Sequence, residues 1–321
     1  MLKFRTAECV TPGHPDKICD IISDSILDAC LEQDPNSRAA IETMGGHGII
    51  SVTGELTTNA YVDMHELIKK VYGKDVGVQT NIVKQSNEIA NGVDTGGAGD
   101  QGIMVGYACN ENQSMIPQEL YLSRKLAKYI YDKHQYDGKT QVTLIDGKID
   151  TVVTSFQNVS TSVLTSLVHD CLGSGNYKLY CNPAGDWTQG GFDADAGVTG
   201  RKLVVDNYGP RVPIGGGAFS GKDATKVDRS GAYMARYIAV DQLKKNSAKE
   251  VYVYLAYAIG KSEPIQATAI VDGIEKNVIS QYNLSPTAIS ELLELKIPKF
   301  SETAAWGAFG NNFKWDNVAW K

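Results

Sequence analysis

The sequence predicts an α+β fold rather than a parallel α/β sheet. Strand-like runs occur in neighbouring pairs, such as 39–43 with 48–58 and 140–146 with 150–156, and helical patterns separate the pairs. Neighbouring strands joined by short turns form antiparallel hairpins, with helices gathered on one side. Two-strand-plus-helix groups recur about three times, although no repeat is visible at the level of single residues. The 321 residues are enough for two or three compact units.

The first quarter of the chain predicts two helices around a strand pair. A helix is expected over 16–34, where apolar residues recur at every fourth position and therefore share one face. Pro15 precedes this helix and Pro35 closes it. The runs 39–43 and 48–58 follow as strands, the second alternating apolar and polar residues. A second helix is expected over roughly 61–72.

The rest of the chain alternates loops, strands and helices. Residues 92–106 are rich in glycine and acid and are expected to be loop. The "DGK" turn between 140–146 and 150–156 predicts a hairpin. The other expected elements are helices over 117–134, 161–171, 228–245 and 285–295, and strands over 177–182, 201–208, 250–260 and 265–273. The last two strands are expected to pair with each other.

Composition excludes several classes of protein. Hydrophobic residues make up 42% and charged residues 21%, as in ordinary globular proteins. No apolar run is long enough to span a membrane, and the N-terminus lacks signal-peptide features, so a cytoplasmic protein is expected. Six scattered cysteines without a C-x-x-C motif predict free thiols rather than a zinc site. A net charge of −6 disfavours nucleic acid as a partner.

One segment departs from this acidic average. Residues 199–230 contain six basic and three acidic residues and several glycines. Such a segment suits a compact polyanion such as a polyphosphate, although a solvated basic surface would explain the charge equally well. Within it, "GGGAFSGKD" (215–223) contains the G-x-x-x-x-G-K frame of a phosphate-binding loop, but Asp223 stands where that motif has Ser or Thr. No strand precedes it directly, which disfavours a Walker-type loop.

Other clusters could carry chemistry or be structural. In "GHPDK" (13–17), His14 and Asp16 flank a proline at the start of a helix, but a helix-terminal charge and a surface histidine look the same. In "GAGDQG" (97–102), Asp100 and Gln101 lie among glycines, as in a surface turn.

The "GRK" motif (200–202) and the lysines and Asp228 of 215–228 together predict a Mg²⁺–polyphosphate site. A salt-bridged loop is the alternative. Glu42 and Glu55 lie on expected strands and either have a cationic partner or face outward.

Together these motifs resemble the S-adenosylmethionine synthetase family, also called methionine adenosyltransferase. The segments "GHPDKICDIISDSILDACLEQDP", "GAGDQGIMVGYA", "VTGRKLVVDNYG" and "GGGAFSGKDATKVDRSGAY" occur in that order, and the resemblance extends from about residue 6 to 310. It implies three similar domains about a pseudo-threefold axis, here 1–90, 91–188 with "GAGDQG", and 189–321 with "GGGAFSGKD". It also implies conversion of ATP and L-methionine to S-adenosylmethionine, followed by cleavage of tripolyphosphate to phosphate and pyrophosphate.

The resemblance further implies two Mg²⁺ ions per site, K⁺, and a homodimer or homotetramer with shared active sites. It assigns catalysis to His14, Lys139, Arg201 and Lys222, with His14 donating near the ribose O5′. ATP binding is assigned to these four residues and to Asp137, Asp186, Trp187, Asp195, Lys202 and Ala218. Methionine binding is assigned to Glu55, Gln85, Asp100, Asp195 and Lys226. Metal binding is assigned to Asp16 and Asp228 for Mg²⁺ and to Glu42 for K⁺.

Two features depart from the family pattern. Asp186-Trp187 replaces the usual Arg-Phe pair, which keeps an aromatic face but reverses a charge. The connection "NGVDTGGAGDQG" (91–102) is also shorter than usual, which predicts a reduced lid and relaxed specificity toward S-alkyl homocysteines. Two further functions stay open on the sequence: a non-catalytic subunit with this fold, and an ATP-dependent phosphotransferase that leaves ADP.

Overall fold

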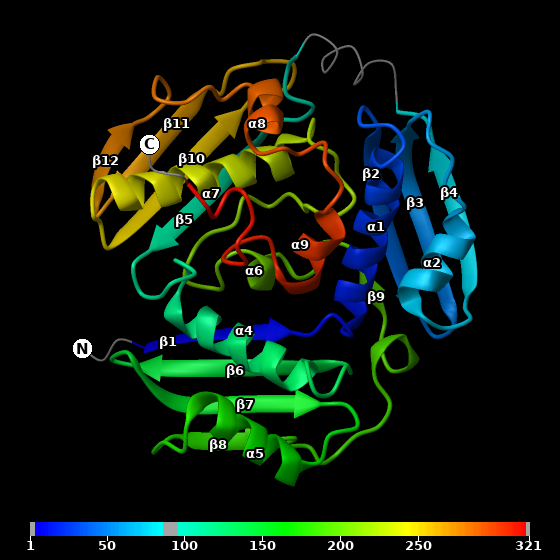
Figure 1. Ribbon diagram of the computed structural model, residues 1–321, viewed down its shortest axis with the longest axis vertical. Helices are drawn as coiled ribbons and strands as arrows, with labels where there is room; N and C mark the ends of the chain where they lie inside the picture. Colours follow the sequence, from blue (N-terminus) through cyan, green and yellow to red (C-terminus); the bar gives the residue numbers. More distant parts are fainter. Residues whose placement is uncertain (1–3, 86–95, 319–321) are drawn as a thin grey trace.

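The computed structural model describes residues 4–85 and 96–318. Within them, three four-stranded sheets surround a central region that contains short helices and loops (Figure 1). Each sheet packs against helices on one side, and the sheets are antiparallel or mixed. The α+β prediction and the arrangement of three similar units are confirmed. None of the helices in the described ranges combines the length and the hydrophobicity needed to cross a membrane.

The first sheet has the strand order β4-β3-β2-β9, and α1 packs against β2. The alternate residues Ala39, Ile41 and Thr43 of β2 are buried on the helix-covered face, whereas Glu42 on the other face is exposed. The elements of this unit are α1 (Pro15–Leu31), β2 (Arg38–Gly46), β3 (Ile49–Thr57), α2 (Met64–Tyr72), β4 (Gly77–Val83) and β9 (Gly197–Val198).

The second sheet has the order β1-β6-β7-β8 and is covered by α4, against which α5 packs. The hairpin around "DGK" forms with both Asp146 and Gly147 at positive φ, as a two-residue turn requires. The elements of this unit are β1 (Phe4–Val10), α4 (Gln118–Tyr131), β6 (Gly138–Ile145), β7 (Lys148–Phe156), α5 (Thr161–Leu172) and β8 (Lys178–Cys181).

The third sheet has the order β12-β11-β10-β5, with α7 lying along β5 and β10. The predicted pairing of 250–260 with 265–273 is confirmed by β10 and β11. The elements of this unit are β5 (Gly102–Cys109), α7 (Val227–Lys245), β10 (Glu250–Tyr257), β11 (Gln266–Val271), β12 (Ile274–Asn277) and α8 (Pro286–Leu292). The short elements α6 (Leu203–Asp206), α9 (Phe300–Trp306) and the 3₁₀ turn Gly191–Asp193 connect the units.

The three units repeat one plan. In each, a helix precedes a hairpin, and the first strand of the hairpin pairs on its other side with an antiparallel strand from a distant part of the chain: β9, β1 or β5. The outer strands β4 and β8 run parallel to their neighbours, whereas β12 is antiparallel. Each sheet is therefore completed by residues outside the run that supplies its other three strands, and the chain ties the units together.

Two predictions of local structure were wrong. Residues 201–208 contain the helix α6 instead of a strand, because Lys202 O and Leu203 O accept hydrogen bonds from N–H groups four residues later. The β-branched residues there favour a strand locally, but tertiary contacts override this preference. The expected loop 92–106 includes the start of β5, and its residues up to 95 lie outside the described ranges. A Cβ at Gly106 would lie 2.1 Å from Ala235 O in α7, so this glycine lets the helix approach the strand.

Among the described elements, β1, β4, β9, β12, α9 and the 3₁₀ turn Gly191–Asp193 had no prediction. The cysteines agree with their prediction, since all six are free and four of them are buried.

Candidate active site

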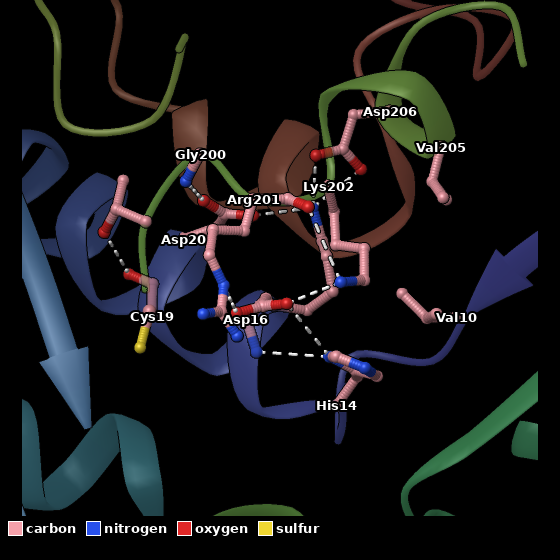
Figure 2. A network of polar contacts seen from close by, with 12 residues as sticks. Val10, His14, Asp16, Cys19, Asp20, Gly200, Arg201, Lys202, Val205 and Asp206 are labelled. Carbon is pink, nitrogen blue, oxygen red and sulfur yellow. Dashed lines mark hydrogen bonds and ion pairs between the residues drawn. The ribbon is translucent and has the colours of Figure 1, made fainter. Parts of the chain in front are cut away.

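The start of α1 meets the segment that follows β9. Asp16, in the first turn of α1, is buried and accepts hydrogen bonds from Val198 N–H at 3.0 Å and Arg201 Nε at 2.9 Å. Lys202 Nζ lies 2.5 Å from its other oxygen. Burial raises the pKa of Asp16, but the hydrogen bonds and charges of these partners outweigh it and lower the pKa overall. Figure 2 shows this carboxylate between the two cations.

His14 caps the N-terminus of α1. Its Nδ1 accepts a hydrogen bond from Asp16 N–H at 3.2 Å. Burial, together with the charges of Lys202 and Lys139, lowers the pKa of His14 to about 4. The imidazole is therefore neutral near pH 7, and the hydrogen bond at Nδ1 assigns the single proton to Nε2. At neutral pH, His14 can therefore donate one hydrogen bond, from Nε2–H.

A buried cluster lies behind these residues. Lys17 Nζ donates to both carboxylate oxygens of Asp206 at 2.7 Å and to Asp20 at 3.2 Å. Asp20 also accepts from Gly200 N–H at 2.8 Å. The cluster connects α1 to the segment that carries Arg201 and Lys202, so it fixes two groups that come from opposite halves of the chain.

The glycine-rich segment 215–221 approaches the same region. A Cβ at Gly200 would lie 2.6 Å from the Cβ of Ala218, so the two segments touch. Lys222 Nζ lies 2.6 Å from Asp228 Oδ2. A Cβ at Gly217 would lie 2.1 Å from the Asp228 carboxyl carbon, so glycine is needed where the loop passes this side chain.

Asp223 stands where a phosphate-binding loop has Ser or Thr, and its contacts are structural. Its carboxylate accepts from Ala39 N–H at 2.7 Å, from Thr225 N–H at 2.8 Å and from Lys226 Nζ at 2.5 Å. These bonds fasten the loop to β2, and Lys222 forms an isolated bridge with Ala40. Asp223 is therefore a structural residue, and its partners explain an acid where a Walker-type loop has Ser or Thr.

Further predicted residues surround His14. Lys139 is exposed at the start of β6, opposite Val10 of β1. Asp137 accepts from Gly191 N–H at 2.9 Å, and burial raises its pKa. Asp195 is exposed and bonds to Ala196 N–H. The charges of Lys139 and Asp195 both act on the pKa of His14, in opposite directions.

Asp186 and Trp187 lie beside α5. Asp186 Oδ1 accepts from Thr161 N–H at 2.9 Å, Thr161 Oγ1 at 2.7 Å and Asn182 Nδ2 at 2.9 Å. Hydrogen bonds from Asn182 and Thr161 lower the pKa of Asp186. The indole N–H of Trp187 donates to Ser155 Oγ at 3.0 Å. The Asp186 carboxylate therefore holds the backbone next to Trp187 in place.

Among the residues predicted to bind methionine and K⁺, Glu42 and Glu55 lie on strands of the first sheet, whereas Gln85 and Asp100 lie outside the strands. Glu55 in β3 is opposite Ala40, and Glu42 is on the same face of the first sheet, opposite Thr53. Gln85 is buried, and its Oε1 has no hydrogen-bond partner among the described residues. Asp100 is exposed and accepts from the N–H of the next residue. Part of the shortened connection 91–102 lies outside the described ranges.

The structure also reveals three aspartates of α1, Asp20, Asp24 and Asp28, that the sequence did not indicate beside the predicted Asp16. Four aspartates recur every fourth position along α1, and each accepts backbone N–H bonds from a distant segment: Val198 to Asp16, Gly200 to Asp20, Gly221 to Asp24, and Phe300 and Ser301 to Asp28. Their spacing of four is the signal that could have found them. One face of α1 therefore organises the loops of the site.

The carboxylates fit Mg²⁺ better than a metal that needs a full protein cage. The described residues contain no group of three or more His, Cys, Asp or Glu side chains able to hold an ion. Asp16 and Asp228 instead present single carboxylates next to lysines and an arginine. Mg²⁺ is commonly held by one or two carboxylates, with substrate phosphates and water completing its coordination. The donor set therefore matches Mg²⁺ bound together with a polyphosphate.

Comparison with protein families identifies all three parts of the chain. The N-terminal, central and C-terminal domains of S-adenosylmethionine synthetase match residues 3–94, 95–186 and 189–317. The matches are consecutive and cover nearly the whole sequence. Enzymes of this family use ATP and methionine and depend on a metal. The chain therefore belongs to the S-adenosylmethionine synthetase family and is a methionine adenosyltransferase.

Proposed function

We propose that the methionine sulfur attacks C5′ of ATP directly and displaces tripolyphosphate, which the enzyme then hydrolyses to phosphate and pyrophosphate. The observation that supports this most is the neutral imidazole of His14 beside the cations of Lys202 and Lys139. A neutral N–H donor among cations suits a leaving oxygen that gains negative charge. It would serve poorly as a base, because its pKa is near 4.

The chemistry needs charge stabilisation rather than proton removal. A thioether sulfur is uncharged and carries no proton, so its attack requires no general base. The cost lies in the negative charge that develops on the departing oxygen and in aligning the sulfur with the bond that breaks. In this proposal His14 Nε2–H donates to O5′ as the C–O bond lengthens. One well-placed donor of this kind contributes about 3–4 kcal/mol.

The phosphate chain is proposed to lie between the two basic segments. Lys139, Arg201, Lys202 and Lys222 would bind its oxygens, and the backbone near Ala218 would approach it closely. Asp16 and Asp228 are the residues that would hold two Mg²⁺ ions, which neutralise phosphate charge when bound. Glu42 is the proposed K⁺ ligand.

The nucleoside and methionine are proposed to lie on either side of His14. Trp187 offers a ring face for adenine, and Asp186 supports its backbone. Asp137 and Asp195 complete the nucleotide side. On the methionine side we propose Glu55, Gln85, Asp100, Asp195 and Lys226. Gln85 Oε1 has no hydrogen-bond partner within 4–85 and 96–318, which supports a ligand contact there.

We also propose that the enzyme works as a homodimer or homotetramer with shared active sites. The support is the face of the first sheet opposite α1. Met44 and Val83 lie on this face and are 54% and 57% exposed, close to Glu42 and Glu55. Covering such apolar side chains with a second copy is favourable and would bring the partner to the methionine side.

One assay tests the reaction. The chain is incubated with ATP, L-methionine, Mg²⁺ and K⁺, and the products are identified. S-adenosylmethionine with phosphate and pyrophosphate is the expected result. ADP as the product would instead identify a phosphotransferase, and no product would identify a non-catalytic subunit.

A further inference from the structure

Each carboxylate proposed to hold Mg²⁺ is paired here with a lysine proposed to bind the polyphosphate. Lys202 Nζ lies 2.5 Å from Asp16 Oδ2, and Lys222 Nζ lies 2.6 Å from Asp228 Oδ2. The first pair joins α1 to the N-cap of α6, and the second joins the glycine-rich loop to the first turn of α7. The same arrangement therefore occurs at both metal positions.

Both pairs are sheltered from water. The side chains of Lys202 and Lys222 are 16% and 22% exposed, and those of Asp16 and Asp228 are 1% and 13% exposed. Salt and solvent weaken such pairs less than they weaken pairs on an open surface. The other oxygen of Asp16 already accepts from Val198 and Arg201, so Lys202 occupies the remaining one.

A lysine ammonium and Mg²⁺ cannot occupy the same side of one carboxylate oxygen. Both are cations and would repel each other strongly at such short range. The lysine must therefore leave the oxygen that it holds before a metal ion binds at that oxygen. Phosphate oxygens are charged acceptors for the lysine ammonium. A bound polyphosphate would therefore stabilise the lysine away from its carboxylate.

We propose that Lys202 and Lys222 cover the two metal carboxylates until a polyphosphate binds, and that this exchange couples metal binding to polyphosphate binding. The inference rests on the proposed function, because it takes Asp16 and Asp228 as the metal ligands. The coupling is reciprocal, so bound metal strengthens polyphosphate binding by the same factor. The ligand-free enzyme then takes up free metal ions poorly but accepts a metal–polyphosphate complex.

The test measures Mn²⁺ binding to the full chain without nucleotide, from the electron paramagnetic resonance signal of free Mn²⁺. The wild type should bind Mn²⁺ weakly. Lys222→Met and Lys202→Met should each bind it about tenfold more tightly at one site, within the usual range of coupling factors. Lys222→Arg keeps a cation in place and should resemble the wild type.

Lys226→Met is the matched control. It removes the same charge four residues from Lys222, but its partner Asp223 holds backbone N–H groups and is not a proposed metal ligand. Its Mn²⁺ affinity should equal that of the wild type. If Lys226→Met and Lys222→Met gained Mn²⁺ affinity equally, net charge would explain the effect and the proposed exchange would be wrong. Tight Mn²⁺ binding by the wild type at both sites would also contradict the proposed exchange.

A double variant separates this inference from the proposed function. Asp228→Asn added to Lys222→Met should abolish the gain in Mn²⁺ affinity, and a gain that persists would refute Asp228 as the ligand that Lys222 covers. Failure of the proposed function looks different: ATP and methionine then give no S-adenosylmethionine even though Mn²⁺ affinity changes as expected. Failure of the exchange alone leaves the reaction intact while Lys222→Met binds Mn²⁺ no more tightly than the wild type.

Discussion

Lys17 and Asp206 form a buried ion pair although 189 positions separate them in the chain. The ammonium in α1 donates to both carboxylate oxygens in α6, at 2.7 Å each. Burial alone would lower the pKa of Lys17, but the charges of Asp206 and Asp20 outweigh it and raise the pKa overall. The ammonium therefore stays charged and holds α6 against the start of α1, where Asp16 meets Lys202.

Replacing this lysine should strongly destabilise the fold. Lys17→Met leaves two carboxylates buried without their cation, and breaking a buried pair in this way costs about 3–5 kcal/mol. The free energy of unfolding in urea measures the loss. Lys314→Met is the matched control, because Lys314 pairs with Glu294 at the surface, and it should cost less than about 1 kcal/mol. Equal losses in the two variants would contradict the prediction.

Asp20 should make stability depend on pH. Burial raises the pKa of Asp20 to about 6, so the folded protein binds more protons there than the unfolded chain between about pH 4 and pH 6. Its contribution to stability therefore falls as pH rises through this window. Relative to Asp20→Asn, which cannot titrate, the wild type should lose up to about 3 kcal/mol between pH 4 and pH 7. Parallel pH profiles of the unfolding free energy would show that Asp20 has an ordinary pKa.

His14→Asn should separate the two chemical steps. Loss of the Nε2–H donor should slow sulfonium formation by about 10²–10³-fold, the usual effect of one oxyanion donor. Hydrolysis of added tripolyphosphate should change far less, because it does not break the C5′–O bond. Single-turnover kinetics of each step provide the measurement. Similar losses in both steps would place His14 at the phosphates instead.

The protonation of His14 can be observed directly. Its pKa near 4 predicts that the ¹³Cε1 chemical shift stays constant from pH 8 to about pH 5.5, whereas an unfolded chain titrates near 6.5. Because the unfolded state binds the proton first, the stability contributed by neutral His14 is lost as pH falls from about 6.5 toward 4. His14→Asn identifies the resonance. A midpoint near 6.5 in the folded enzyme would refute the neutral imidazole.

Trp187 should affect nucleotide binding more than turnover. Stacking of a base on an aromatic ring is worth about 1–3 kcal/mol, so Trp187→Ala should raise the KM for ATP by roughly tenfold with a smaller change in kcat. Trp187→Phe keeps a ring but loses the hydrogen bond to Ser155, and should be intermediate. Steady-state kinetics at saturating methionine test this. An unchanged KM in Trp187→Ala would remove the ring from the adenine site.

Local patterns in the sequence were enough to find many elements. The "DGK" turn predicted its hairpin because both turn residues adopt the positive φ that Asp-Gly tolerates. The apolar residues at every fourth position predicted α1, since they form its buried face. The edge strand β12 and the short helix α9 were missed. The start of α9 depends on Asp28, whose carboxylate binds the N–H groups of Phe300 and Ser301 some 272 positions away.

The site was only partly predictable for the same reason. Residue types and spacing indicated the basic segment, the glycine-rich loop and the two aspartates near helix starts. They could not indicate that Asp16 meets Lys202 or that Asp223 binds Ala39, because these contacts join residues far apart in the chain. The row of aspartates on α1 was visible in the sequence, but its partners were not.

By itself, the sequence determined the α+β class, the elements with strong periodicity and the family of the enzyme, because these depend on residue types at fixed local spacings. Only the tertiary structure decided which strand completes each sheet, that residues 201–208 contain a helix, and which cation covers which carboxylate. Those outcomes depend on burial and on charges brought together across distant segments, where the free energy of a pair exceeds the preference of any single residue.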